Sequence, residues 1–140
     1  MILVDLNVVL DVIQKREPHY GASAAVLARV VSGSVTGALP AHAVTTIHYL
    51  VGRHQPRVVA DSAVDWLLRY FVIAAIGREQ LLRARALGWD DFEDAVVAAG
   101  AESSGCSTII TRNVKDFTGS PVEALTPQEW LLTTGPVGRE

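Results

Sequence analysis

The chain has 140 residues, of which 49% are hydrophobic and 19% charged, and it contains no low-complexity tract, so we expect one globular domain spanning residues 1–140. The apolar stretches are far too short to cross a membrane, and the N-terminus lacks the basic segment and cleavage site of a signal peptide. A lone cysteine, Cys106, excludes an internal disulfide, which fits a cytoplasmic protein.

The net charge of −3 is unevenly distributed along the chain. Residues 14–85 hold nine Lys and Arg against four Asp and Glu, whereas the remainder holds three basic and eleven acidic residues. An acidic centre with a basic surround suits a metal site that serves a polyanion, and ordinary surface charge is the alternative interpretation.

Short apolar runs alternate with amphipathic segments from one end of the chain to the other. In chain order, the pattern predicts a strand at 2–5, helices from 6 or 7 to 13 and over 20–32, a strand at 35–39, helices over 41–52 and 55–70, a strand at 71–76, helices over 78–87 and 91–104, a strand at 107–111, a short fifth strand at 122–125, and a last helix capped by Thr126. This alternation predicts a three-layer α/β domain, with a parallel sheet of four to five strands flanked by helices.

Two of the predicted strands end in polar segments that contain acids. Asp5 follows the run Ile2–Val4, and the strand at 107–111 leads into the segment TRNVKDF, which ends Asp116-Phe117. Ligands bind at the carboxyl edge of an open parallel sheet, and we expect these two strand ends to be neighbours there. The alternative for Asp5 is a helix cap, and for Asp116 a solvated turn.

A third group of acids precedes an almost wholly apolar helix, in the segment Asp90-Asp91-Phe92-Glu93-Asp94. Helix geometry predicts that Asp91 and Asp94 share one face, with Glu93 about a quarter turn away. Asp91 as N-cap and the helix dipole explain one or two of these acids. Four acids exceed that need and would repel one another without a cation, so we interpret Asp94 as functional.

Carboxylate oxygens favour Mg²⁺ or Mn²⁺ as the metal in such a site. The four histidines, at positions 19, 42, 48 and 54, follow no zinc-ligand spacing and are expected at the surface or in packing, although His54 could contact phosphate. No dinucleotide, P-loop or nucleophile-elbow motif is present, and Cys106 lacks an activating context.

Three segments together resemble the PIN-domain family, especially the small bacterial VapC-like toxins. They are ILVDLNVVLD at Ile2–Asp11, DFEDA at Asp91–Ala95 and TRNVKDF at Thr111–Phe117. The ending LTPQEWL at Leu125–Leu131 is also similar. The resemblance covers the whole chain in order. It implies a Rossmann-like sheet and a Mg²⁺- or Mn²⁺-dependent endoribonuclease, which would be the toxin of a type II toxin–antitoxin pair.

The resemblance also implies roles for particular residues. Asp5, Asp94 and Asp116 match the metal-binding acids, with Asp91 or Glu93 as a possible further ligand; Asn7, Thr111 and Asn113 match polar positions beside them, the last two as catalytic residues. For contacts to the RNA backbone we expect Arg53, Arg57, Arg112 and Lys115. The implied protein partners are a small antitoxin and a second copy of the chain in a homodimer. Core packing is the favoured interpretation of Tyr49, Trp66 and Tyr70.

One departure from the family pattern leaves an alternative open. Many PIN domains carry a Glu on the helix after the second strand, and here Thr46 falls at about that position, in a segment without acids. The alternative function is therefore a weak or inactive PIN-like module that binds RNA or a protein. A phosphotransfer domain with Asp5 as covalent nucleophile is disfavoured, because position 7 is Asn and the D-x-D pattern is absent.

Overall fold

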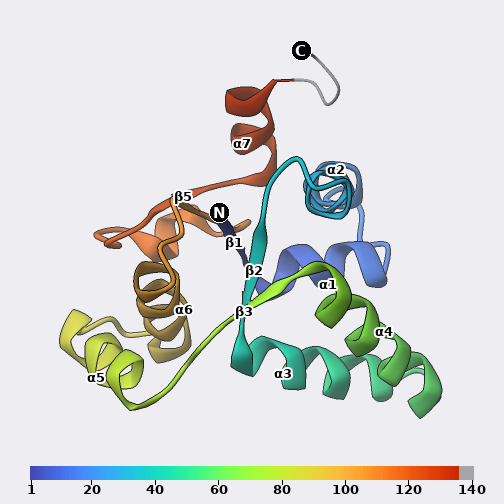
Figure 1. Cartoon of the computed structure of the whole chain (residues 1–140), viewed down its shortest axis with the longest axis horizontal. Coiled ribbons are helices and arrows are strands. Elements are labelled where there is room, and N and C mark those ends of the chain that lie inside the picture. Colours follow the sequence, from blue (N-terminus) through green and yellow to red (C-terminus); the bar gives the residue numbers. More distant parts are fainter. Residues whose placement is uncertain (136–140) are drawn as a thin grey trace.

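The computed structural model describes residues 1–135, in which helices and strands alternate along the chain (Figure 1). In order, the elements are β1 (Ile2–Val4), α1 (Leu6–Ile13), α2 (Tyr20–Val31), β2 (Gly37–Pro40), α3 (Ala41–Gly52), α4 (Arg57–Tyr70), β3 (Val72–Ala74), α5 (Arg78–Leu87), α6 (Phe92–Ser103), β4 (Thr108–Ile110), the 3₁₀-helix η1 (Val114–Phe117), β5 (Glu123–Leu125) and α7 (Pro127–Thr134). The N-terminus of α7 has the predicted capping box, in which Thr126 and Glu129 bond each other's backbone.

The five strands form one parallel sheet in the order β3-β2-β1-β4-β5. The chain therefore starts in the middle of the sheet and winds outward in both directions, as in Rossmann-like folds. The prediction of a three-layer α/β domain is confirmed, including the short fifth strand. The order also makes β1 and β4 neighbours, so the polar segments that follow these two strands leave the sheet side by side.

Alternating strand residues face two separate cores, because successive side chains of a strand point to opposite faces. Ile2, Val4 and Ile110 pack with α1 to α4 and with Trp130 of α7. Leu3 and Ile109 face the other way, against α6 and Phe117. In Figure 1, α5 and α6 accordingly lie on one side of the strands, and α1, α3 and α4 lie on the other. The three central strands β1, β2 and β4 are thus buried on both faces, which explains their largely apolar sequences.

Three local predictions differ from the structure. β2 begins at Gly37 and includes Pro40, and β3 is shorter than the predicted 71–76. β3 is an edge strand, and its first residue Val72 is 48% exposed, so it is not the buried strand that its apolar sequence suggests. Tyr49 is 64% exposed on α3, which makes the core interpretation of this residue wrong. Trp66 is 37% exposed and packs against Tyr70 and Phe71.

Cys106 is buried beside Ile109 in the core under α6, as its sequence context predicts. None of the helices within residues 1–135 is long and apolar enough to cross a membrane.

Candidate active site

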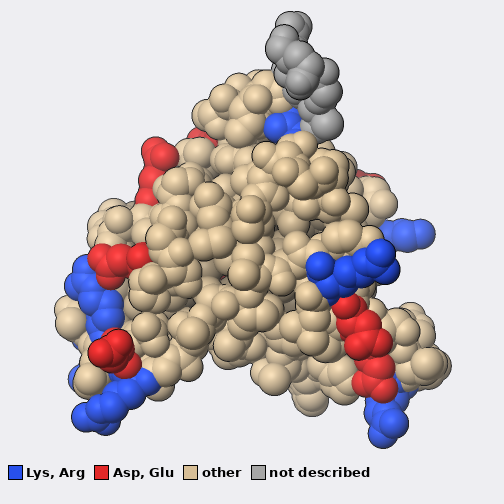
Figure 2. All heavy atoms as spheres, in the orientation of Figure 1, with Lys and Arg blue, Asp and Glu red and all other residues tan. Residues whose placement is uncertain are grey.

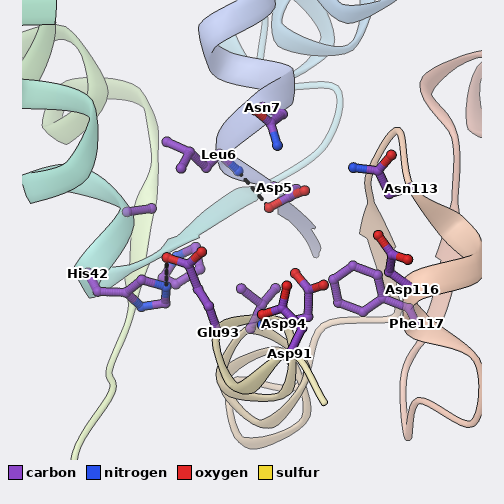
Figure 3. Close-up of a pocket in the computed structure, with 13 residues that line it drawn as sticks. Asp5, Leu6, Asn7, His42, Asp91, Glu93, Asp94, Asn113, Asp116 and Phe117 are labelled. Carbon is purple, nitrogen blue, oxygen red and sulfur yellow. Dashed lines mark hydrogen bonds and ion pairs between the residues drawn. The ribbon is translucent and has the colours of Figure 1, made fainter. Parts of the chain in front are cut away.

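A pocket of about 160 Å³ lies at the carboxyl edge of the sheet, where β1, β2 and β4 end (Figure 3). Five carboxylates and three other polar side chains line it, and these eight residues come from four separate segments of the chain. The acids are Asp5, Asp91, Glu93, Asp94 and Asp116, and the others are Asn7, His42 and Asn113. Hereafter this pocket is called the acidic cleft. Within residues 1–135, no Lys or Arg side chain lines it.

The register between β1 and β4 brings Asp5 beside Thr111. Val4 pairs with Ile110, so the next residue of each chain segment leaves the sheet at the same level. The Thr111 hydroxyl donates to Asp5 Oδ2 at 3.0 Å, and both side chains are buried. The other oxygen, Asp5 Oδ1, accepts from the backbone N–H of Leu6 at 2.9 Å and so caps α1. These two hydrogen bonds hold Asp5 in one orientation. Asp5 therefore both caps α1 and lines the cleft.

The N-terminus of α6 supplies three of the acids. Asp91 is the N-cap, and its Oδ1 accepts from the backbone N–H of Asp94 at 3.1 Å. Asp94 follows in the first turn and is partly buried. Glu93, predicted about a quarter turn away from these two, points toward His42 at the start of α3 in Figure 3 and lines the same cleft.

The loop after β4 forms the opposite wall. Thr111 Oγ1 accepts from the backbone N–H of Asn113 at 3.1 Å, and this bond starts the turn that leads into η1. Asp116 lies in η1, and its exposed carboxylate reaches the cleft from there. In Figure 3 the Asp116 side chain faces those of Asp91 and Asp94 across the cleft. Asp5, Asp94, Asp116 and Asn113 therefore come together, while Thr111 lies behind Asp5.

Crowding of the acids changes their ionisation. The pKa of Asp94 is raised to about 7, first by burial and then by the charges of Asp91 and Asp5. Burial also raises the pKa of Asp5, while the hydrogen bonds from Thr111 and from the Leu6 backbone oppose this rise. Near neutral pH Asp94 is therefore only partly ionised, and a bound cation would favour its ionised form.

The donor set fits a hard divalent cation. No Lys or Arg is among the described lining residues to neutralise its carboxylates, and like charges in one pocket are stabilised by a positive ion. Among residues 1–135, no three His, Cys, Asp or Glu side chains converge closely enough to coordinate one ion as they stand. Mg²⁺ characteristically takes one or two carboxylates and keeps several waters, so it does not require three convergent ligands.

The cations predicted to contact RNA are not gathered at the cleft. Arg53 follows the far end of α3, about 16 Å along the helix from His42 at its start. There it lines a groove with Lys15, Arg16 and His54, and Arg57 pairs with Asp61 on α4. Lys115 is closer, in a shallow hollow that shares Asp91 and Asp116 with the cleft. Figure 2 shows the charged side chains of one face gathered mainly on its outer parts, around α5 and α4.

His42 lines the cleft, although the sequence interpretation placed it at the surface or in packing. Its Nε2 lies 3.8 Å from Glu93 Oε2. The signal for this position was available, since His42 is the second residue after the end of β2 at the ligand-binding edge of the sheet. Thr46, at the position of the absent acid, donates its hydroxyl to the backbone carbonyl of His42 at 3.2 Å. Helix α3 therefore contributes the imidazole of His42 to the cleft and no carboxylate.

Comparison with known proteins supports this description. A family model described as "PIN domain" matches residues 1–115 of the chain. A toxin–antitoxin complex from Klebsiella pneumoniae contains a chain with a similar fold, at TM-score 0.69 and 22% identity, covering 91% of this chain and 98% of that one. VapBC2 of Rickettsia felis, bound to a promoter DNA fragment, is similar at TM-score 0.66 and 19% identity, with 90% and 98% covered.

A third similar structure is VapC20 of Mycobacterium tuberculosis, a toxin that cleaves the sarcin-ricin loop. The TM-score is 0.67 at 16% identity, and the alignment covers 87% of this chain and 96% of that toxin. These low identities establish a shared fold. The sequences of curated proteins include no match to this chain.

Proposed function

The chain belongs to the PIN domain family, and on this premise we propose that it is a Mg²⁺- or Mn²⁺-dependent endoribonuclease, the toxin of a type II toxin–antitoxin pair. The observation that carries the proposal is the acidic cleft, where five carboxylates from three segments line one pocket without a Lys or Arg among the described lining residues. An arrangement that raises the pKa of Asp94 to about 7 is unfavourable for folding, and cation binding is its most direct use.

Asp5 and Asp94 would hold the ion, with Asp116 as a third ligand or as acceptor for a bound water, and Asp91 or Glu93 at the margin. The ion, when bound, supplies the positive charge that acidifies a water and stabilises negative charge on the phosphoryl oxygens. Thr111 keeps Asp5 in its ligand orientation through the 3.0 Å hydrogen bond. The Asn113 side chain faces the cleft (Figure 3) and is suited to orient a scissile phosphate or a water by its amide.

RNA is the proposed substrate, with single-stranded or looped segments as the readable form. Lys115 stands beside the cleft and would contact the backbone nearest the reaction. Arg53 and Arg57, at the far end of the α3–α4 pair, would contact phosphates several nucleotides away. The hollow next to Lys115 also includes Trp89, whose ring packs edge-on against Phe117 at 5.8 Å, so packing is the first role of this tryptophan.

A cognate antitoxin and a second copy of the chain are the proposed protein partners. Support for the antitoxin comes from the fold shared with chains of VapBC and other toxin–antitoxin complexes. Support for self-association comes from apolar side chains on α4 and β3. Val58, Leu68 and Val72 are 67%, 54% and 48% exposed, which is unusual for residues of this kind on adjoining elements. Location in the cytoplasm remains a prediction.

The test of the nuclease is RNA cleavage with Mn²⁺ by the wild type and by Asp94→Asn, with and without EDTA. A matched control is Glu102→Gln, which changes an exposed acid at the other end of the same helix, α6. We expect cleavage to be lost in Asp94→Asn and with EDTA and retained in Glu102→Gln. Cleavage that survives either Asp94→Asn or the chelator would overturn the assignment.

The second candidate is a PIN-like module that binds without cleaving, and the absence of an acid from the part of α3 that lines the cleft favours it. Calorimetric titration with Mn²⁺ separates the two candidates. Binding that disappears in Asp94→Asn supports the nuclease, whereas no heat of binding, even with RNA present, supports the module. For the toxin role, expression of the chain should arrest growth, and co-expression of a cognate antitoxin should restore it.

A further inference from the structure

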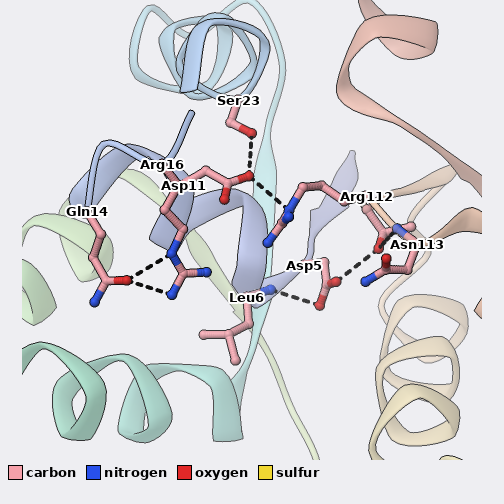
Figure 4. Close-up of polar contacts among 9 residues, drawn as sticks. Asp5, Leu6, Asp11, Gln14, Arg16, Ser23, Arg112 and Asn113 are labelled. Atoms are coloured by element: carbon pink, nitrogen blue, oxygen red, sulfur yellow. Dashed lines mark hydrogen bonds and ion pairs between the residues drawn. The ribbon is translucent and has the colours of Figure 1, made fainter. Parts of the chain in front are cut away.

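Asp11 is an acid that the cleft does not use. It lies in the last turn of α1 with none of its surface exposed. Its Oδ2 accepts a hydrogen bond from the Ser23 hydroxyl of α2 at 3.1 Å (Figure 4). The same oxygen lies 3.1 Å from Nε of Arg112, an ion pair by distance although the N–H is not aligned as a hydrogen-bond donor. Oδ1 has no hydrogen-bond partner among the described residues.

A buried carboxylate is strongly unfavourable unless a cation lies beside it. Arg112 is the cation that forms an ion pair with Asp11 in the described part of the chain. The nearby Arg16 is engaged elsewhere, because its guanidinium donates to the Gln14 side chain at 2.6 and 3.0 Å. The Asp11–Arg112 pair is therefore a link between α1 and the loop after β4, two segments a hundred residues apart in the sequence.

Arg112 lies between two residues of the turn beside the acidic cleft. Its two neighbours are Thr111, which donates to Asp5, and Asn113, whose backbone N–H donates to Thr111 Oγ1. Asn113 lines the acidic cleft, whereas Arg112 lines a separate pocket of about 180 Å³ with Ser23 and residues at the start of α7. Figure 4 shows the Arg112 side chain reaching from this loop toward α1, away from Asn113. The turn is thus held from both sides.

We propose that Asp11, supported by Ser23, is a positioning residue for the active site. It holds Arg112, and Arg112 keeps the Thr111–Asn113 turn in the geometry that orients Asp5 and presents the Asn113 amide to the substrate. This inference rests on the proposed nuclease function for its effect on catalysis. It also gives Arg112 a role different from the RNA-backbone contact that the sequence suggests, because the guanidinium is committed to a buried carboxylate.

Steady-state cleavage by four variants tests the role. They are Asp11→Asn, Arg112→Gln, the double variant, and the control Glu102→Gln, which breaks the exposed Arg83–Glu102 pair. We expect each single variant of the Asp11–Arg112 pair to lower kcat by about 10–100-fold with KM changed by less than about twofold. The kcat of the double variant should be no lower than that of the less active single variant, because both single variants already break the same ion pair. Each rate is corrected for the folded fraction measured by circular dichroism.

Two results would overturn the proposal. If Arg112→Gln raises KM and reduces the salt dependence of binding while Asp11→Asn keeps the wild-type kcat, Arg112 is a phosphate contact. If the loss of rate disappears after correction for the folded fraction, the pair only stabilises the fold.

Hydrogen exchange provides a readout that needs no catalysis. In the metal-free and RNA-free protein, we expect the amides of residues 111–117 to exchange faster in Asp11→Asn and Arg112→Gln than in the wild type, with no change in α5. Unchanged protection of 111–117 would contradict the inference. If the wild type cleaves no RNA, the proposed function is refuted. The hydrogen exchange of residues 111–117 would then still test whether the Asp11–Arg112 pair holds this loop. If Asp11→Asn does not fold, Ser23→Ala removes one donor, keeps the ion pair and is expected to show the same local change to a smaller extent.

Discussion

The carboxylates at the two ends of α1 have opposite environments. Asp5 caps the helix and faces Asp94 and Asp116 in a cleft that no Lys or Arg of the described residues lines. Asp11, in the last turn, is buried against Arg112. The first arrangement leaves negative charge available to a ligand at a cost in stability, whereas the second uses the opposite charge to join two segments. The difference shows that the fold places an arginine beside one buried acid, Asp11, and that no arginine of residues 1–135 lines the cleft.

The largest effect is expected when one negative charge is removed from the acidic cleft. Asp94→Asn should lower the cleavage rate by about 10³-fold or more, because several kcal/mol of transition-state stabilisation depend on the bound cation. Calorimetry should show the loss of Mn²⁺ binding in parallel. A variant that binds Mn²⁺ as the wild type does would show that Asp94 is not a ligand.

Removing the cation from the paired acid should affect folding. Arg112→Gln leaves Asp11 buried without its partner, and we expect the free energy of unfolding to fall by about 2–4 kcal/mol, less than for a wholly buried pair since Arg112 is partly exposed. Urea unfolding at pH 7 measures this loss. The double variant Asp11→Asn/Arg112→Gln carries no buried charge and should be more stable than Arg112→Gln alone. Additive losses would show that the two side chains do not interact.

A smaller change keeps every charge and removes one hydrogen bond. Thr111→Val retains the shape of the side chain but cannot donate to Asp5. In the wild type, this hydrogen bond opposes the rise in the pKa of Asp5 that burial causes. We expect a rate about tenfold lower near pH 6 and an acidic limb of the pH–rate profile shifted to higher pH, because Asp5 is then harder to ionise. Thr118→Val, on the exposed end of the same loop, is the matched control.

The unpaired acids should also give the metal-free protein a distinctive pH dependence. The pKa of Asp94 is about 7 in the folded state against 3.8 for an unperturbed aspartate carboxyl. Its contribution to stability is therefore present below about pH 4 and is lost as the pH rises to 7, since the unfolded chain releases this proton first. Asp94→Asn should have a Tm about 2–6 °C above the wild type at pH 8 and no advantage at pH 4. Equal Tm values at pH 8 would contradict the shift.

The smallest effect is expected for an exposed pair on the α3–α4 arm. Asp61 contacts His48 at 2.8 Å and Arg57 at 3.5 Å, and all three side chains are substantially exposed. Asp61→Asn should change the free energy of unfolding by about 0.5 kcal/mol or less. Since it frees Arg57, it should leave RNA affinity unchanged or slightly higher in a filter-binding assay. Clearly weaker RNA binding would exclude Arg57 as a backbone contact.

The positions of the acids at the site could be anticipated because strand ends are visible in the sequence. Asp5 and Thr111 follow apolar runs, and parallel strands place their carboxyl ends at one edge. The approach of His42 to Glu93 could not be anticipated from helical spacing, because it depends on how the start of α3 lies relative to the start of α6. The Asp11–Arg112 pair was also missed, although an acid within the apolar segment Val8–Ile13 is a sign of a buried charge that needs a partner.

The sequence by itself determined the alternation of strands and helices, the parallel sheet and the residues that leave its carboxyl edge, because these depend on hydrophobic period and on local capping and turn preferences. The tertiary structure decided which acids remain without a cation, which acid is paired, and how far the basic residues of α3 and α4 lie from the cleft. Such relations depend on distances between segments remote in the chain. Charge interactions depend on these distances and on burial, and neither is a property of local sequence.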